Sequence, residues 1–506
     1  MVLLNRGKNM IEKQINRLIH FGLQKGLITE FDQVYATNLL LGTLGVPEFL
    51  PMPIEETLET ATPILEEMLA YAVEKNIIED TILQRDLFDT KIMNCIMPRP
   101  SEIIGKFDAL YQQSPEAATD FYYNLSIASN YVRKDRTDKN IVWKTATDYG
   151  NLDISINLSK PEKDPKDIAK AKLIKSAAYP KCLLCKENEG FFGHLNHPAR
   201  QTHRIIPLDL NHKVWFLQYS PYVYYNEHCI VLNSEHVPMK ISRVTFENLL
   251  AFLDILPHYI VGSNADLPIV GGSILSHDHY QGGRYTFAME TAEVEKTYCI
   301  KGYEEISVGR VKWPLSVLRL RAAHKEKLID LAEHILTAWR GHSDEAVELL
   351  ASSNGEPHNT ITPIARMRGG AYELDLVLRN NRSSDKHPLG IFHPHSEVHH
   401  IKKENIGLIE VMGLAILPAR LEQELKLIRK ALIEGIDDIS EVESIAKHAG
   451  WYQEIRTKYT KITSQNVNEV LQKEVGLKFL TVLSHAGVFK RNEIGLQAFN
   501  KFVAIL

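Results

Sequence analysis

The sequence predicts an α+β protein in which helical segments flank a middle part that contains strands. Over residues 10–135 the apolar residues recur at helical spacing, as at i, i+4, i+7 and i+8 from Ile11 onward, which is typical of amphipathic helices. Over residues 152–158 apolar and polar residues alternate strictly, which indicates a half-buried strand. Helical spacing returns over residues 418–506, so the chain passes from helical to mixed and back to helical.

The composition excludes several broad classes of protein. The chain has 506 residues, of which 44% are hydrophobic and 24% charged, and its formal net charge is −5. This length allows several domains, and the charge gives no overall attraction to nucleic acid or to an anionic membrane. The chain shows no apolar run of membrane-spanning length, no signal-peptide core at its start and only five cysteines. We therefore expect a cytoplasmic protein with reduced thiols and with neither nucleic acid nor membrane as a partner.

The N-terminal helical part contains several separate helices. After a proline-rich break, a helix is expected to begin near Ile54, with Pro63 as a kink or break within it. A further periodic run begins at Ile82. No residue here belongs to a recognisable catalytic or metal-binding pattern, so we interpret residues 1–150 as an N-terminal helical module.

Two cysteines at C-x-x-C spacing follow a segment rich in lysine and alanine, for which we expect a helix to about Ser176. Cys182 and Cys185 are suitably spaced to bind one tetrahedral metal ion from a tight turn. A redox pair or two core cysteines are the alternatives for this spacing. His236, which follows an apolar, strand-like run, is a candidate for a further metal ligand, and so is His277.

The most informative stretch is residues 271–283, in which two histidines and a glutamine alternate between flanking glycine pairs. In a strand, His277, His279 and Gln281 would point to one face, because side chains alternate with period two. Imidazole acts as nucleophile, base or metal ligand near neutral pH, and a carboxamide binds a phosphate oxygen without adding charge. The glycines allow a ligand to approach the backbone closely. For H-x-H alone, the alternative is a polar strand end with histidines in a turn.

The complete H-x-H-x-Q pattern behind a Gly-Gly turn resembles the active-site stretch of galactose-1-phosphate uridylyltransferases, which belong to the histidine-triad superfamily. The helical ends and the run 157–163 resemble the longer, type 2 branch of this family. The resemblance implies an internally duplicated, histidine-triad-like antiparallel sheet core with helical N- and C-terminal extensions. The first half, with a zinc site and the nucleophile, would span residues 151–304, the second half residues 305–417, and the C-terminal helical region residues 418–506.

The resemblance also implies a reaction. UMP would be exchanged between UDP-glucose and galactose 1-phosphate, in the Leloir pathway of galactose metabolism, by a ping-pong double displacement through a uridylyl-histidine intermediate. His279 would be the nucleophile, and Gln281 would donate to a non-bridging phosphate oxygen. No organic cofactor is implied. In the shorter members of the family a C-x-x-C, a later histidine and the first histidine of H-x-H bind zinc. The matching residues here, which imply a structural zinc ion, are Cys182, Cys185, His236 and His277.

Further residues are implied as substrate contacts. Asn226 would hydrogen-bond the nucleotide, with Tyr222 or Tyr225 stacking on the base, unless this segment is simply a strand with half-buried tyrosines. Arg200 would neutralise phosphate, unless it belongs to a solvated basic loop. Glu410 would accept a hydrogen bond from a sugar hydroxyl. The remaining contacts to phosphate or hexose are expected at Ser273, Ser276, Asn405 and Lys403, with Lys402 as the alternative to Lys403.

A second metal site is doubtful from the sequence. In the shorter relatives a glutamate at the offset of Glu295 binds this metal together with later histidines, but the later strand-like run 372–378 contains no histidine here. The run from His393 to His400 contains H-P-H, which many relatives have as their nucleophile motif. No glutamine follows it at the right place and no C-x-x-C precedes it at suitable spacing, so we do not assign the nucleophile to it.

Two other functions fit part of the pattern. A nucleotidyl hydrolase or dinucleotide phosphorylase of the same superfamily shares the histidine nucleophile but usually has another histidine where Gln281 stands. A zinc-stabilised, non-catalytic binding protein would tolerate replacement of His279. The family resemblance favours the transferase, with UDP-glucose, UDP-galactose and hexose 1-phosphates as partners, and it implies a homodimer.

Overall fold

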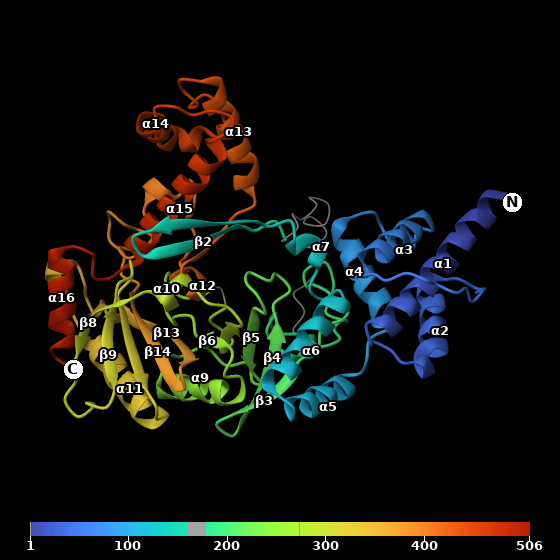
Figure 1. Ribbon diagram of the computed structural model, residues 1–506, viewed down its shortest axis with the longest axis horizontal. Coiled ribbons are helices and arrows are strands. Elements are labelled where there is room, and N and C mark those ends of the chain that lie inside the picture. The colour runs from blue at the N-terminus through green and yellow to red at the C-terminus, as the bar shows by residue number, and fades with distance from the viewer. Residues whose placement is uncertain (1, 160–178, 273) are drawn as a thin grey trace. The chain divides into compact units, whose positions relative to one another are not determined.

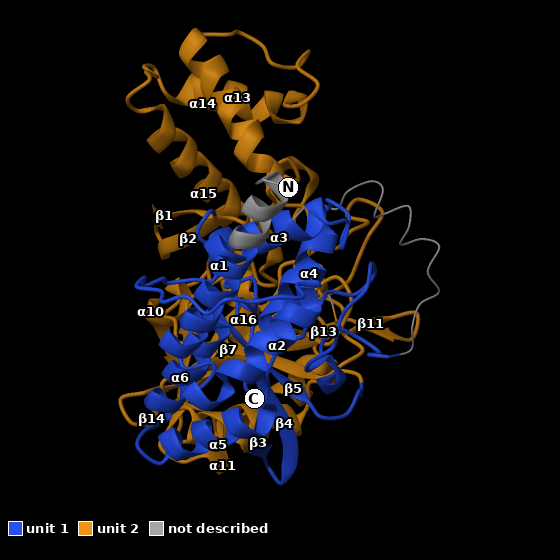
Figure 2. Ribbon diagram, turned by 90° about the vertical axis from the view of Figure 1, so that its right-hand side faces the viewer, with its two compact units in different colours: residues 1–139, 159–223, 227–237 blue, residues 140–158, 224–226, 238–506 orange. Residues whose placement is uncertain are grey.

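A computed structural model of the chain describes residues 2–159, 179–272 and 274–506. The chain divides into two compact units (Figure 2). The first unit contains residues 1–139, 159–223 and 227–237, and the second contains residues 140–158, 224–226 and 238–506. The helix expected to about Ser176 and the predicted contact Ser273 lie outside the described residues. Within these ranges no helix combines the length and the hydropathy that crossing a membrane requires.

Helices form the first part of the first unit, as the periodicity predicts (Figure 1). Pro63 lies in the first turn of its helix, where the missing N–H has no helical partner to lose. The prediction of a helix that begins near Ile54 is wrong, because residues 54–60 contain no helix. The helices are α1 (Val2–Gln24), α2 (Gln33–Leu44), α3 (Thr62–Glu74), α4 (Ile82–Asn94), α5 (Pro100–Tyr111), α6 (Pro115–Ala128) and α7 (Lys134–Thr137).

The first unit also contains an antiparallel sheet of β3 (Ile206–Leu210), β4 (Lys213–Tyr219) and β5 (Cys229–Asn233). Two buried tyrosines connect α6 to this sheet. The hydroxyl of Tyr122 donates to the carbonyl of Arg204 at 2.5 Å, and that of Tyr219 donates to the carbonyl of Thr119 at 3.1 Å. The two rings lie 4.8 Å apart, so the helices and the sheet share one packed core.

The second unit is built around an antiparallel sheet in the order β7-β6-β13-β14-β10-β9-β8. Helices α9 (Arg243–Ile255) and α11 (Lys325–Gly341) both pack against β13. The strands are β6 (Ile260–Gly262), β7 (His279–Gly283), β8 (Val294–Tyr298), β9 (Ser307–Val311), β10 (Val317–Ala322), β13 (Asn359–Arg368) and β14 (Ala371–Asn380).

A smaller sheet of the second unit contains β1 (Ile141–Thr147), β2 (Gly150–Ile156) and β15 (Leu414–Leu417). β2 is the strand predicted from the alternation after residue 150. It is buried on both faces from Leu152 to Ile156, whereas the alternation predicts burial of one face only. β15 pairs with β2 in parallel, and Asp153 and Ser155 are covered although they are polar.

The order of elements repeats along the chain, which confirms the predicted internal duplication. A meander of three antiparallel strands, a helix and an antiparallel strand pair occur first as β3-β4-β5, α9 and β6-β7. They occur again as β8-β9-β10, α11 and β13-β14. β6 pairs with β13, so the corresponding strands of the two repeats meet in the sheet of the second unit. The α+β class with an antiparallel core is therefore confirmed.

The C-terminal part is helical, as predicted. It contains α13 (Arg420–Glu434), α14 (Ala449–Lys458), α15 (Val467–Ala486) and α16 (Glu493–Val503), with the short η5 (Ala446–His448) before α14. The helices α13 to α15 lie together in Figure 1. Apolar side chains of α13, α14 and α15, such as Ile428, Trp451 and Phe479, join one hydrophobic core with residues of β2 and β15.

A buried cluster of charges lies within the sheet of the second unit. The carboxylate of Asp375, on β14, accepts hydrogen bonds from Arg319 Nε at 2.7 Å and from Arg366 Nη2 at 2.8 Å. Glu373 accepts a further bond from Arg366 Nε at 2.8 Å. Although burial alone would raise the pKa of Asp375, the guanidinium groups of Arg366 and Arg319 hold this pKa below its ordinary value. Asp375 is therefore ionised and compensates two buried cations.

Replacing Asp375 with Asn is expected to destabilise the second unit, because it leaves two buried guanidinium groups under-compensated. We expect the free energy of unfolding to fall by about 3–5 kcal/mol, measured by urea denaturation. Glu422→Gln, which breaks an exposed pair with Lys426, is the control and is expected to cost less than about 1 kcal/mol. Equal effects of the two substitutions would contradict this assignment.

Candidate functional site

The histidine stretch presents two polar side chains on one face of β7. We expected His277 to lie in the same strand as His279. The strand begins only at His279, so His277 lies in the bend before it. Between His279 and Gln281, the hydroxyl of Tyr280 points the other way and accepts a hydrogen bond from Asn248 Nδ2 of α9 at 3.0 Å. One face of β7 is thus turned to α9, and the opposite face carries the imidazole and the carboxamide.

The His279 ring has a defined orientation and a defined tautomer. Its Nδ1 lies 2.8 Å from the carbonyl oxygen of His277. Because a carbonyl only accepts hydrogen bonds, Nδ1 carries the proton and Nε2 keeps its lone pair. Burial lowers the pKa of His279 to about 4, so the ring is neutral at pH 7. A neutral imidazole held in this way is suited to nucleophilic attack from Nε2.

The Gly271-Gly272 turn packs tightly against residues 264–267. A Cβ on Gly271 would lie 2.5 Å from the carbonyl oxygen of Ala265, and one on Gly272 would lie 2.6 Å from Asn264 Nδ2. Asn264 Oδ1 in turn accepts a hydrogen bond from the backbone N–H of Leu408 at 2.9 Å. Asn264 therefore lies between the glycine turn and the segment around residue 408. The sequence did not single out this residue, because an asparagine in a loop matches no motif.

The predicted hexose-binding segment contains a buried ion pair. Glu410, in α12 (Leu408–Val411), accepts hydrogen bonds from Lys402 Nζ at 2.9 Å and from the backbone N–H of Gly407 at 3.1 Å. Asn405 Oδ1 lies 3.2 Å from His393 Nε2. Lys403 is exposed. Lys402 thus balances the charge of Glu410, and the contact of Lys403 with phosphate stays a prediction.

The predicted nucleotide contact lies beside the end of β7. Asn226 is exposed, and its Nδ2 donates to the carbonyl of Arg284 at 3.3 Å. Tyr225 is buried, donates to the carbonyl of Gly282 at 2.9 Å and packs against the ring of Phe287. This burial favours a structural role for Tyr225 over base stacking. Ser276 is exposed in the loop before β7.

The C-x-x-C motif and His236 come together within the first unit. Cys185 Sγ lies 3.5 Å from Cys182 Sγ and 3.2 Å from His236 Nδ1. Asn188 Nδ2 donates to the carbonyls of both cysteines, at 2.8 and 2.7 Å, and so fixes the turn. Burial raises the pKa of the Cys182 thiol to about 11, whereas a bound cation would favour the thiolate. Two thiols and an imidazole within 4.8 Å of one another are suitable ligands for a metal ion.

The two arginines of the basic loop have different surroundings. Arg204 is buried, and its guanidinium donates to the carbonyls of Pro98, Gln201 and His203, which is a structural role. The guanidinium of Arg200 lies over the ring of Tyr131, 5.6 Å from its centroid. A guanidinium that packs over a ring by its face can still donate from its N–H groups to an anion.

The carboxylate considered for a second metal is held by arginines. Arg491 donates to both oxygens of Glu295, at 2.7 and 2.6 Å, and Arg310 Nε donates at 2.5 Å. These contacts hold the pKa of Glu295 below its ordinary value, although burial alone would raise it. A cation at Glu295 would have to displace two guanidinium groups.

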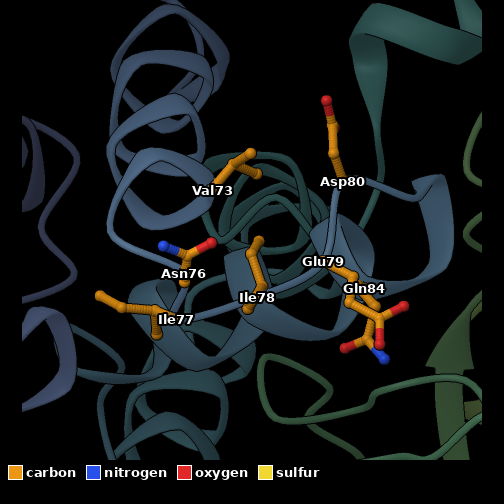
Figure 3. A pocket seen from close by; sticks show the side chains of 7 residues that line it. All are labelled: Val73, Asn76, Ile77, Ile78, Glu79, Asp80 and Gln84. Atoms are coloured by element: carbon orange, nitrogen blue, oxygen red, sulfur yellow. The ribbon is translucent and has the colours of Figure 1, made fainter.

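A pocket of about 520 Å³ in the first unit does not offer comparable chemistry. It lies where α3 ends and α4 begins, and its lining includes Asn76, Glu79 and Asp80 (Figure 3). The lining contains no imidazole, thiol or cationic side chain. The pocket therefore provides neither a nitrogen nucleophile nor a positive charge for a phosphate group.

Comparisons with known proteins cover nearly the whole chain. Residues 27–238 match the profile of the N-terminal domain of galactose-1-phosphate uridyl transferase, and residues 252–448 match that of its C-terminal domain. A galactose-1-phosphate uridylyltransferase of Clostridium acetobutylicum is 67% identical and covers 98% of this chain and 100% of its own length. Those of Caldanaerobacter subterraneus and Bacillus subtilis are 54% and 51% identical, and the alignments cover 97% of this chain and 96% and 97% of the relatives.

Among solved structures, a yeast Ap4A phosphorylase matches with a TM-score of 0.33 and 11% identity. The match covers 58% of this chain and 87% of that chain.

The thiol and imidazole cluster is expected to bind a metal ion. We expect about one equivalent of a transition metal per chain in protein purified without chelators, measured by inductively coupled plasma mass spectrometry. Cys185→Ser is expected to lose most of this metal, because it replaces a soft ligand. Cys95→Ser, at a cysteine outside the cluster, is the matched control and should keep the metal. Equal metal contents in the two variants would exclude this site.

Proposed function

The chain belongs to the galactose-1-phosphate uridyl transferase family, and we propose that it exchanges UMP between UDP-glucose and galactose 1-phosphate. The products are glucose 1-phosphate and UDP-galactose. Similarity over nearly the full length of relatives with this name supports the proposal. The observation that carries the mechanism is the neutral, oriented imidazole of His279.

We propose His279 as the nucleophile of two successive displacements. Nε2 attacks the α-phosphorus of UDP-glucose, the N–P bond forms, and the bond to glucose 1-phosphate breaks. A phosphate oxygen of galactose 1-phosphate then attacks the same phosphorus and releases the imidazole. The leaving group of the first step and the attacking group of the second step are both sugar phosphates of low basicity, so neither step requires a strong general acid or base. Catalysis depends instead on alignment and on stabilisation of charge at phosphorus.

Gln281 is proposed to stabilise the charge that develops on the phosphoryl group. It stands two residues after His279 in β7, and the period-two alternation of side chains along a strand supports a carboxamide on the same face as the imidazole. An amide N–H stabilises a non-bridging oxygen without repelling the second anionic substrate. Ser276, in the loop before β7, is proposed as a further donor to phosphate. Ser273, which lies outside the described residues, is proposed for the same role.

Five further residues are proposed to contact the hexose phosphate or the nucleotide. Glu410 is proposed to accept from a hexose hydroxyl, which is supported by its buried position beside Lys402. Asn405 and Lys403 are proposed to contact the hexose phosphate. On the nucleotide side, Asn226 is proposed as a hydrogen-bond partner and Arg200 as a charge partner.

We propose that the metal ion is a structural zinc ion bound by Cys182, Cys185 and His236, with His277 as the fourth ligand. Zinc in such a closed, four-ligand site stabilises structure and takes no part in the reaction. The proposal gives His277 two functions. Its imidazole would bind the ion, while its carbonyl oxygen accepts the hydrogen bond from His279 Nδ1. Immobilising the residue in this way would also immobilise the carbonyl that orients the nucleophile.

The sequence left two alternative functions open. One is a nucleotidyl hydrolase or dinucleotide phosphorylase, and the other is a zinc-stabilised, non-catalytic binding protein. High identity to transferases, and glutamine at the position of Gln281, favour the transferase. The homodimer implied by the family resemblance stays a prediction.

Replacing His279 with Ala is expected to abolish transfer, because it removes the proposed carrier of the uridylyl group. Incubation with UDP-glucose labelled in the uridine, without acceptor, is expected to leave acid-labile label on the parent protein and none on the variant. The turnover number should fall by at least about 10⁴-fold.

His324→Ala, which removes an exposed imidazole at the start of α11, is the control and should label normally. Galactose 1-phosphate should release the label from the parent as UDP-galactose. Label that persists in His279→Ala would move the nucleophile to His393 or His395. Absence of label from the parent would overturn the double displacement.

Gln281→Ala is expected to lower the turnover number by about 10²–10³-fold, which is the usual effect of losing one donor to a developing charge. The substitution leaves His279 in place, so the label should still form, but more slowly. Rapid-quench measurement of label formation separates this effect from weaker binding of UDP-glucose. A change in KM alone would assign Gln281 to substrate binding rather than to stabilisation of the transition state.

A further inference from the structure

One buried arginine of the second unit has no carboxylate beside it. Arg379, on β14, is 1% exposed. Its Nη2 donates to the carbonyl oxygen of Ile406 at 2.8 Å, and its Nη1 donates to Thr362 Oγ1 at 3.4 Å. Among the residues that the structure describes, no carboxylate forms an ion pair with this guanidinium. Its positive charge therefore faces only the dipoles of neutral groups.

Two other buried arginines of the same sheet have the usual arrangement. Arg319 and Arg366 both donate to the carboxylate of Asp375. Burying a cation without an opposite charge costs free energy. Burial lowers the pKa of Arg379 to about 10, although the charge of Glu410 opposes this shift, so the group is still cationic at pH 7. Because the sheet pairs its other arginines, the unpaired charge of Arg379 points to a function.

The carbonyl that Arg379 holds belongs to Ile406, within the segment proposed to bind the hexose phosphate. The backbone N–H groups of the next two residues are also held. The first donates to Glu410 Oε2 at 3.1 Å, and the second donates to Asn264 Oδ1 at 2.9 Å. Asn264 in turn adjoins the glycine turn that precedes His279. Arg379 thus fixes one end of a run of backbone groups that extends towards the proposed nucleophile.

The other charged groups of this segment have opposite charges beside them. Glu410 accepts from Lys402 Nζ at 2.9 Å. Glu404 lies 3.7 Å from the same Nζ, and water screens its charge because its side chain is 60% exposed. Of these groups, only Arg379 is buried without an opposite charge in contact.

The charge of Arg379 also acts on the far side of the segment. Burial is the main cause of the lowered pKa of His393, and the charge of Arg379 adds to this lowering. His393 Nε2 lies 3.2 Å from Asn405 Oδ1. The field of the guanidinium therefore extends to the surroundings of a side chain that is proposed to contact phosphate.

We propose that Arg379 is a positioning residue for the phosphate of the hexose 1-phosphate. It holds the backbone of the segment through Ile406, and its unpaired charge favours a sugar that carries an anionic phosphate over a free sugar. Because Arg379 is buried, it acts through the segment and through its field rather than by touching the substrate. This inference rests on the proposed transfer and assigns a residue that selects its substrate class.

Steady-state transfer by the full chain, with galactose 1-phosphate varied at saturating UDP-glucose, tests the inference. Arg379→Met removes the charge and the directed donors at similar length. We expect the KM for galactose 1-phosphate to rise at least about tenfold, because an interaction of a charged group is lost. The turnover number should fall less than about threefold, because the reacting groups stay in place. Arg379→Lys keeps the charge and one donor, and should bring the KM to within about threefold of the parent value.

Arg204→Met is the matched control. Arg204 is also buried and donates to three carbonyl oxygens, but it belongs to the first unit. Its loss should lower the free energy of unfolding without changing the KM. Urea denaturation of all three variants separates an effect on stability from an effect on substrate.

An unchanged KM in Arg379→Met, or an equal rise in Arg379→Lys, would overturn the inference and leave the proposed transfer standing. Absence of transfer by the parent protein would overturn the proposed function, and the inference with it.

Discussion

The hydrogen bond from His279 Nδ1 to the carbonyl of His277 determines what the proposed active site is able to do. A carboxylate at this position would raise the basicity of the ring and favour a role as general base. A carbonyl fixes the same tautomer while leaving the ring neutral. When a neutral ring attacks phosphorus from Nε2, it keeps its Nδ1 proton and becomes cationic. The carbonyl dipole then stabilises this cation without quenching its reactivity as a leaving group in the second displacement.

Much of the positive charge buried in the second unit is organised by carboxylates. Asp375 and Glu373 bind Arg366, and Asp375 also binds Arg319. Glu295 is held by two further guanidinium groups. A guanidinium fixes carboxylates with directed hydrogen bonds, so these pairs supply the rigidity that a coordinated ion would otherwise provide. The carboxylates are consequently committed to the stability of the fold.

The sequence predicted the periodic features well and the long-range ones poorly. The helical ends, the strand after residue 150 and the duplicated core all follow from hydrophobic spacing or from the family resemblance. Pro63 was misjudged because a proline that begins a helix and one that breaks it have the same local sequence. Asn264 and the contact of Arg379 with Ile406 were not predictable, since each depends on residues brought together from distant parts of the chain.

The two repeats carry different side chains on their final strands, so presenting the proposed nucleophile and holding buried charges are separate tasks. In the first repeat, the final strand β7 presents His279 and Gln281. In the second, the corresponding strand β14 presents Glu373 and Asp375, which hold buried arginines. One copy of the motif thus carries the proposed nucleophile, while the other carries carboxylates that hold buried arginines. A chain of this kind can alter its substrate-facing surfaces in one half without changing the residues that hold the sheet together in the other.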